Sequence, residues 1–144
     1  STYSRQGMPD YLIIFRKWTE DYLDAEPVTH TFESFTLDMW QRYASPVWFD
    51  IRQTNVLNVQ AARDDKDEKH ICPLQLDVIE RAIELWTNPG DIVFTPFLGI
   101  GSEAYQALKM KRRAVGIELK ESYFNQAVKN CQSVIEEENQ ISLF

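Results

Sequence analysis

Apolar residues in the second half of the chain follow helical spacing in three segments, separated by two short apolar runs. From residue 73 to 90 they recur every three or four positions, which predicts a helix with one buried stripe formed by Leu74, Val78, Ile79, Ala82, Ile83 and Trp86. The same spacing predicts helices at 103–110 and 121–137. The runs at 92–94 and 114–119 predict strands. This order predicts half of a doubly wound α/β sheet, with right-handed crossovers placing helices on both faces.

The first half is less regular. The β-branched and aromatic run Tyr11–Phe15 predicts an edge strand near 11–15, and its open edge makes a homodimer a candidate assembly. A short helix is predicted at Leu37–Tyr43, with Thr36 as its N-cap. We therefore divide the chain into an irregular α/β segment, 1–69, and a more regular unit, 70–144.

Composition narrows the class of protein. At 144 residues and 44% hydrophobic content, the chain can form a single core. No apolar run approaches the roughly 20 residues that span a bilayer, so we expect a soluble cytoplasmic protein without membrane contact. Cys72 and Cys131 lack metal-ligand spacing, and no metal site is expected. The net charge of −7 provides no general attraction for nucleic acid, so such a partner must be held by local patches or by missing sequence.

Glycines cluster where a strand is followed by a helix. Gly99 and Gly101 lie between the run at 92–94 and the helix at 103–110, where a side chain would obstruct a ligand facing the free N–H groups of the helix. Glu118 follows about 20 residues later at the tip of the next strand, where a carboxylate can accept hydrogen bonds from ribose hydroxyls. This combination is typical of a site for a nucleoside-bearing cofactor.

Other interpretations of the same residues stay open. A glycine pair can serve a structural turn, and Glu118 alone is as typical of a solvated strand end. The segment Gly99–Ala104 also fits the looser G-x-G-x-x-A pattern, so a nicotinamide or flavin enzyme is a rival. That rival would favour the pattern in the first strand–helix unit, without Pro96 and Phe97 between strand and glycine.

Several segments together resemble the amino-group DNA methyltransferases, which use S-adenosylmethionine to methylate adenine N6 or cytosine N4. The similarity rests on residues 88–103, 112–120 and 122–124, and phage and prophage members share the segments at 40–50 and 70–76. The order of segments is that of the permuted class, in which the catalytic half precedes the cofactor half. The resemblance implies a partial Rossmann-like sheet of the S-adenosylmethionine-dependent methyltransferase type, and this chain corresponds to the C-terminal part.

The resemblance also implies roles for individual residues. Glu118 would bind the ribose hydroxyls, and His70 would approach the methionine tail of the cofactor, although a core or capping role for this histidine is equally open. The family usually has Asp where this chain has Thr95, which removes a charge that could engage the cofactor's ammonium group. The loop expected to wrap the methionine part contains Thr95, Pro96, Phe97, Gly99, Gly101 and Ser102.

The family's catalytic loop is not found in this sequence. Members hold the target amino group with an Asp/Asn/Ser-Pro-Pro-aromatic tetrapeptide, whose aromatic residue stacks on the flipped base. The nearest imitation is Ser45-Pro-Val-Trp48, which Val47 interrupts and whose place matches the family's connecting region. We expect no catalytic residue in this chain and the tetrapeptide upstream of Ser1.

The sequence hypothesis is therefore the cofactor-binding half of a DNA methyltransferase of the restriction-modification or prophage type. S-adenosylmethionine would be its cofactor, and double-stranded DNA would be the partner of the full-length protein. The fragment alone should bind cofactor weakly and be inactive. The alternatives are an NAD(P)- or flavin-binding Rossmann enzyme, and a non-catalytic remnant or protein-binding module.

Overall fold

The computed structural model describes residues 10–17, 20, 26–58 and 72–141. His70 and the predicted boundary between residues 69 and 70 lie outside these ranges. The described elements are, in chain order, α1 (Leu37–Tyr43), α2 (Leu76–Trp86), β1 (Ile92–Thr95), α3 (Ser102–Lys109), β2 (Arg113–Gly116) and α4 (Glu121–Ile141). None of the helices in these ranges has the length and apolar content that a membrane span requires.

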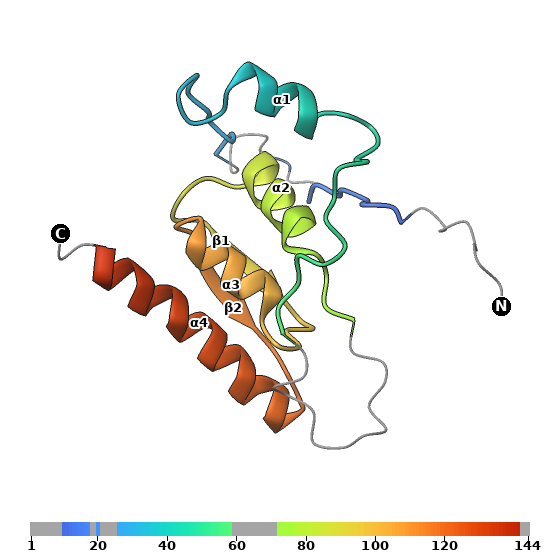
Figure 1. The fold of residues 1–144 in the computed structure, drawn as a ribbon. Helices are drawn as coiled ribbons and strands as arrows, with labels where there is room; N and C mark the ends of the chain where they lie inside the picture. Colours follow the sequence, from blue (N-terminus) through green and yellow to red (C-terminus); the bar gives the residue numbers. More distant parts are fainter. Residues whose placement is uncertain (1–9, 18–19, 21–25, 59–71, 142–144) are drawn as a thin grey trace, which may run out of the picture.

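Within the described ranges, the sheet consists of two parallel strands. Register runs from Ile92 opposite Arg113 to Thr95 opposite Gly116. The helix α3 connects the strands and contacts both of them, as well as α2 and α4, and it lies between these two helices in Figure 1. The predicted α/β order of the second half is confirmed, because each of its strands and helices is present.

The core lies between the helices and one face of the sheet. One cluster combines Ile79 and Ile83 of α2 with Ala107 of α3, which has no exposed surface. A second cluster joins Leu98 and Ala127 with Ala104. Because Cβ atoms alternate between the faces of a strand, only every second strand residue reaches these clusters.

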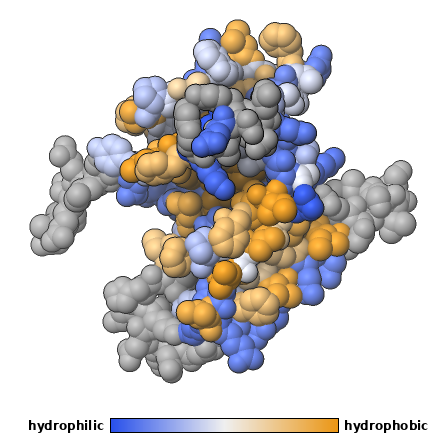
Figure 2. Space-filling view, turned by 180° about the vertical axis from the view of Figure 1, so that it is seen from behind, coloured by the Kyte–Doolittle hydropathy of each residue, from blue (hydrophilic) through white to orange (hydrophobic). Residues whose placement is uncertain are grey.

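The other face of the sheet is uncovered among the described residues, which corrects the expectation of helices on both faces. Ile92, Phe94 and Val115 are more than half exposed. Consecutive right-handed units that advance in one direction along a sheet place their helices on the same face. Seen from behind, Figure 2 shows hydrophobic residues gathered over the middle of the molecule.

The N-terminal residues differ from the prediction at one place. Residues 10–17 form neither helix nor strand, so the edge strand predicted near 11–15 is wrong for this structure. Tyr11 and Phe15 are 81% and 86% exposed. A strand exists only through hydrogen bonds to a neighbour, and the strands of the described sheet, β1 and β2, pair with each other.

The helix predicted at Leu37–Tyr43 is confirmed, including its cap. The Thr36 hydroxyl accepts a hydrogen bond from the Met39 N–H at 3.3 Å. A second attachment joins the N-terminal half to the turn before β1, where the Asn88 side chain accepts from the Thr29 N–H (2.9 Å) and donates to the Pro27 carbonyl (3.0 Å). The irregular half is thus fixed to the regular one by polar contacts.

Candidate cofactor site

The glycine loop, residues 96–101, connects β1 to α3 at the carboxyl end of the sheet. Gly99 and Gly101 have φ angles of +54° and +88°, a left-handed conformation in which glycine is strongly favoured. The α3 helix starts at Ser102 with Gly101 as N-cap and has no side-chain cap. Its first N–H groups have no acceptor within the helix, which is the arrangement that favours anions and polar ligands.

Glycine is required at two loop positions for different reasons. A Cβ atom at Gly101 would lie 2.9 Å from the Ala127 Cβ atom and 3.1 Å from its Cα atom, so α4 packs directly against the loop. A Cβ atom at Gly99 would meet nothing within 4 Å. Of these two glycines, only Gly99 therefore borders open space, in the manner expected of a position facing a ligand.

Glu118 comes within hydrogen-bonding distance of the loop. Its Oε2 atom accepts from the Gly99 N–H at 2.8 Å, and its Oε1 atom accepts from the Lys120 N–H at 2.9 Å. A carboxylate offers about four lone-pair sites, so two remain for a ligand. The residue that the sequence associates with ribose thus has a second role, which is to hold the glycine loop.

The backbone of the loop is also tied to the end of the second strand. The Leu98 N–H donates to the Ile117 carbonyl at 2.9 Å, and the Ile117 N–H donates to the Thr95 carbonyl at 3.1 Å. These bonds continue the contact between the two strand ends into the loop. The structure thereby brings together the predicted residues Thr95, Pro96, Phe97, Gly99, Gly101, Ser102 and Glu118.

These residues differ in accessibility. Phe97 is 86% exposed, whereas Ser102 is 4% exposed and faces the protein interior. The Thr95 hydroxyl accepts from the Phe97 N–H at 3.3 Å. Burial raises the pKa of Glu103, in the first turn of α3. Thr95 and Glu103 therefore place a hydroxyl and a partly desolvated carboxyl at the two ends of the loop.

Sequence reasoning missed Asn130 of α4, which contacts this region, and Gln126, which contacts Asn130. The Asn130 amide donates to the Ile100 carbonyl at 2.8 Å, and its side-chain oxygen accepts from the Gln126 amide at 2.9 Å. The sequence feature that could have indicated Asn130 is its position, as a polar residue, beside the apolar stripe formed by Ala127, Cys131 and Val134. Helical spacing places Asn130 on nearly the same side as that stripe.

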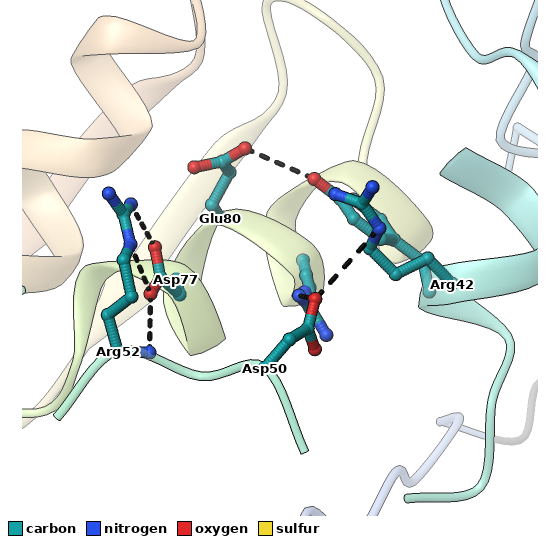
Figure 3. Close-up of a pocket in the computed structure, with 7 residues that line it drawn as sticks. Arg42, Asp50, Arg52, Asp77 and Glu80 are labelled. Carbon is teal, nitrogen blue, oxygen red and sulfur yellow. Dashed lines mark hydrogen bonds and ion pairs between the residues drawn. The ribbon is translucent and has the colours of Figure 1, made fainter. Parts of the chain in front are cut away.

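A separate polar pocket of about 200 Å³ lies between α2 and the segment 42–52, and no predicted site residue lines it (Figure 3). Its charged residues pair with one another, although the buried Nη1 atom of Arg81 has no hydrogen-bond partner. Asp77 accepts from the Arg52 backbone N–H at 2.9 Å and from its guanidinium at 3.0 Å. The Arg81 guanidinium donates to Asp50 at 2.7 Å and lies about 5 Å from the rings of Tyr43 and Trp48.

The pKa values of the pocket follow from these contacts. Hydrogen bonds from Arg52 hold the pKa of Asp77 well below its usual range. Burial and the neighbouring Glu80 carboxylate, which accepts from the Tyr43 hydroxyl at 3.1 Å, raise the pKa of Tyr43 to about 12. The contacts around the pocket form a clamp, which attaches residues 42–52 to α2. Within the described residues, no group of His, Cys, Asp or Glu side chains could hold a metal ion.

Comparison with known proteins assigns this arrangement to a family. The model of the DNA methylase family N6_N4_Mtase matches residues 6–129. The type II methyltransferase M1.MboII of Moraxella bovis is 41% identical over 58 residues, covering 40% of this chain and 22% of that protein. The type II methyltransferase M.BglI of Bacillus subtilis is 28% identical over 125 residues, covering 86% of this chain and 31% of that protein.

A solved structure agrees in fold. The crystal structure of a protein from Thermus thermophilus, assigned as a DNA modification methylase and complexed with S-adenosyl-L-methionine, superposes with a TM-score of 0.56. It is 24% identical, and the match covers 76% of this chain and 39% of that one. The chain spans 22% to 35% of the length of the first curated methyltransferases that it matches.

Proposed function

Because this chain belongs to the DNA methylase family, we propose that it is the cofactor-binding half of an amino-group DNA methyltransferase that uses S-adenosylmethionine. The observation that carries the proposal is the Glu118 carboxylate against the Gly99 N–H, at 2.8 Å, beside the open space over Gly99. This arrangement combines a carboxylate that has two lone-pair sites left with a loop that is open at Gly99. Both are needed to hold a ribose next to a strand end.

The residues present fit the cofactor in chemistry as well as in position. Glu118 would accept hydrogen bonds from the ribose hydroxyls with its remaining lone pairs. The first N–H groups of α3 would face the polar methionine part, with Thr95 and Ser102 at the two ends of the loop. We also propose that His70 approaches the methionine tail, as the family resemblance implies.

The cofactor, when bound, supplies a methyl group on a sulfonium, which is a good leaving group. The remaining requirement is to place the target amine lone pair against that methyl group. No Asp/Asn/Ser-Pro-Pro-aromatic tetrapeptide is present in this sequence. We therefore propose that this chain binds cofactor without methylating DNA by itself, and that double-stranded DNA is the partner of the longer protein.

Glu118→Gln tests the ribose role apart from the loop role. The glutamine oxygen can still accept from the Gly99 N–H, whereas the amide NH2 replaces the oxygen that accepts from the Lys120 N–H and cannot accept from a ribose hydroxyl. We expect calorimetric titration to show weaker binding of S-adenosylhomocysteine by roughly tenfold to a hundredfold, since hydrogen bonds to a charged group are lost. Glu121→Gln removes the same charge at an exposed position of α4 and should leave the affinity for S-adenosylhomocysteine unchanged.

Titration with NAD separates the alternatives. Binding of NAD in preference to S-adenosylhomocysteine would favour the nicotinamide enzyme. Binding of neither ligand by the unaltered chain would contradict the proposal for this chain and favour a non-catalytic module. The permuted order of segments, the prophage origin, a homodimer and a cytoplasmic location stay predictions.

A further inference from the structure

We propose that Asn130 is a positioning residue for the glycine loop, acting on the cofactor site through the Ile100 carbonyl. This inference rests on the proposed function, because the loop shape that Asn130 maintains is the shape offered to the cofactor. Asn130 lies on α4, about 30 residues along the chain from the loop it contacts. Only the fold therefore brings Asn130 into contact with the loop.

The hydrogen bonds of Asn130 orient it in one direction. Its Oδ1 atom accepts from the Gln126 Nε2 group at 2.9 Å, which directs its own Nδ2 group to the Ile100 carbonyl at 2.8 Å. Gln126 is one helical turn earlier on the same face of α4. The pair thus presents a fixed donor to the loop.

The loop is held from two sides at neighbouring residues. Glu118 accepts from the Gly99 N–H, and Asn130 donates to the Ile100 carbonyl. These two partners come from different elements, the end of the second strand and the last helix. Ile100 itself is 2% exposed, so its carbonyl has little access to water as a replacement partner.

Contact with α4 reinforces this restraint. Ala127, three residues before Asn130, lies 2.9 Å from the place that a Cβ atom of Gly101 would take. Ala127 and Asn130 therefore fix adjacent parts of the loop from one helix face. With Asn130 removed, the contact at Gly101 and the bond from the Gly101 N–H to the Leu98 carbonyl (2.8 Å) would remain, but the Ile100 carbonyl would lose its partner and that side of the peptide its restraint. The open space over Gly99 would then change shape.

Two substitutions test the proposal. Asn130→Asp keeps the shape and the bond from Gln126 but removes the donor to Ile100 and sets a carboxylate oxygen against a carbonyl oxygen. Asn130→Ala removes both bonds and favours the helix, so it guards against loss of folding as the explanation. Asn125→Asp is the matched control, because it makes the same charge change at an exposed position of α4.

Binding and local opening are measured together in the full chain. We expect the two Asn130 variants to weaken S-adenosylhomocysteine binding by about threefold to tenfold, the effect of one neutral hydrogen bond. Hydrogen exchange at the Gly99 and Gly101 amides should quicken several-fold without a matching change in the α2 amides. A purely structural role would instead quicken exchange in the loop and α2 alike.

Unchanged loop exchange and unchanged affinity in both Asn130 variants would overturn the proposal, as would equal effects in Asn125→Asp. Should the unaltered chain bind no S-adenosylhomocysteine, the proposed function fails for this chain. The exchange measurement still decides the positioning role in that case. The two failures are therefore distinguishable.

Discussion

Gly101 and Gly90 share a backbone angle but differ in their surroundings. Both have φ of +88°. A Cβ atom at Gly101 would meet Ala127, whereas a Cβ atom at Gly90 would meet nothing within 4 Å. The sequence pattern indicated that residue 101 had to be small for the sake of a ligand, but the structure gives helix packing as the reason.

We expect Gly101→Ala to be more destabilising than Gly90→Ala. Each change places alanine in a left-handed conformation, at a cost of about 1–2 kcal/mol. Gly101→Ala adds overpacking against α4, worth about 1–3 kcal/mol. Urea unfolding of the two variants measures the difference, and an equal loss of unfolding free energy would contradict the close contact.

At the scale of elements, the boundaries show where sequence reasoning succeeds. Helices were predicted closely because their signals are local, namely the apolar spacing for α3 and the Thr36 cap for α1. The strand predicted at 114–119 instead spans Arg113–Gly116. It ends there because the Ile117 carbonyl and the Glu118 side chain accept hydrogen bonds from the glycine loop. The clamp between α2 and residues 42–52 could not be predicted, since its partners are about 25 to 31 residues apart.

Asp77 makes that clamp sensitive to acid. Its pKa is lower in the folded chain than the unfolded value of about 3.9. Its contribution to stability is therefore complete above that unfolded value and is lost as pH falls toward the folded pKa. Acid should loosen the attachment of residues 42–52 to α2.

We expect Asp77→Asn to lower the free energy of unfolding by about 1–3 kcal/mol at neutral pH, since hydrogen bonds to a charged group are lost. The difference from the unaltered chain should shrink as pH falls below about 4. Asp38→Asn is the control, because its ion pair with Arg42 is exposed and worth about 0.3–0.5 kcal/mol. Denaturant unfolding followed from pH 7 to 3 measures both, and a constant difference would contradict the assignment.

At the scale of the whole molecule, the two faces of the sheet contribute unequally to stability. Ile83 lies in the cluster between α2 and α3 and is 4% exposed, whereas Phe94 on the other face is 58% exposed. A parallel sheet is ordinarily covered on both faces. Sequence alone does not reveal which face the described helices cover, because both faces of these strands carry apolar residues.

We expect Ile83→Ala to lower the free energy of unfolding by about 2–5 kcal/mol, the usual range for a core truncation. Phe94→Ala should cost less than about 1 kcal/mol, because much of its surface is exposed already. Thermal or urea unfolding of the two variants compares these losses of unfolding free energy. Similar losses would mean that the Phe94 face is covered in solution.

The sequential arrangement of the helices and strands has a consequence for the order of folding. The elements α2, β1, α3, β2 and α4 follow one another between residues 76 and 141, and α3 contacts its neighbours along the chain. Contacts of short sequence separation close small loops and form quickly. We therefore expect this block to form first, and the attachment of Asn88 to Thr29, 59 residues away along the chain, to form on a scaffold that already exists.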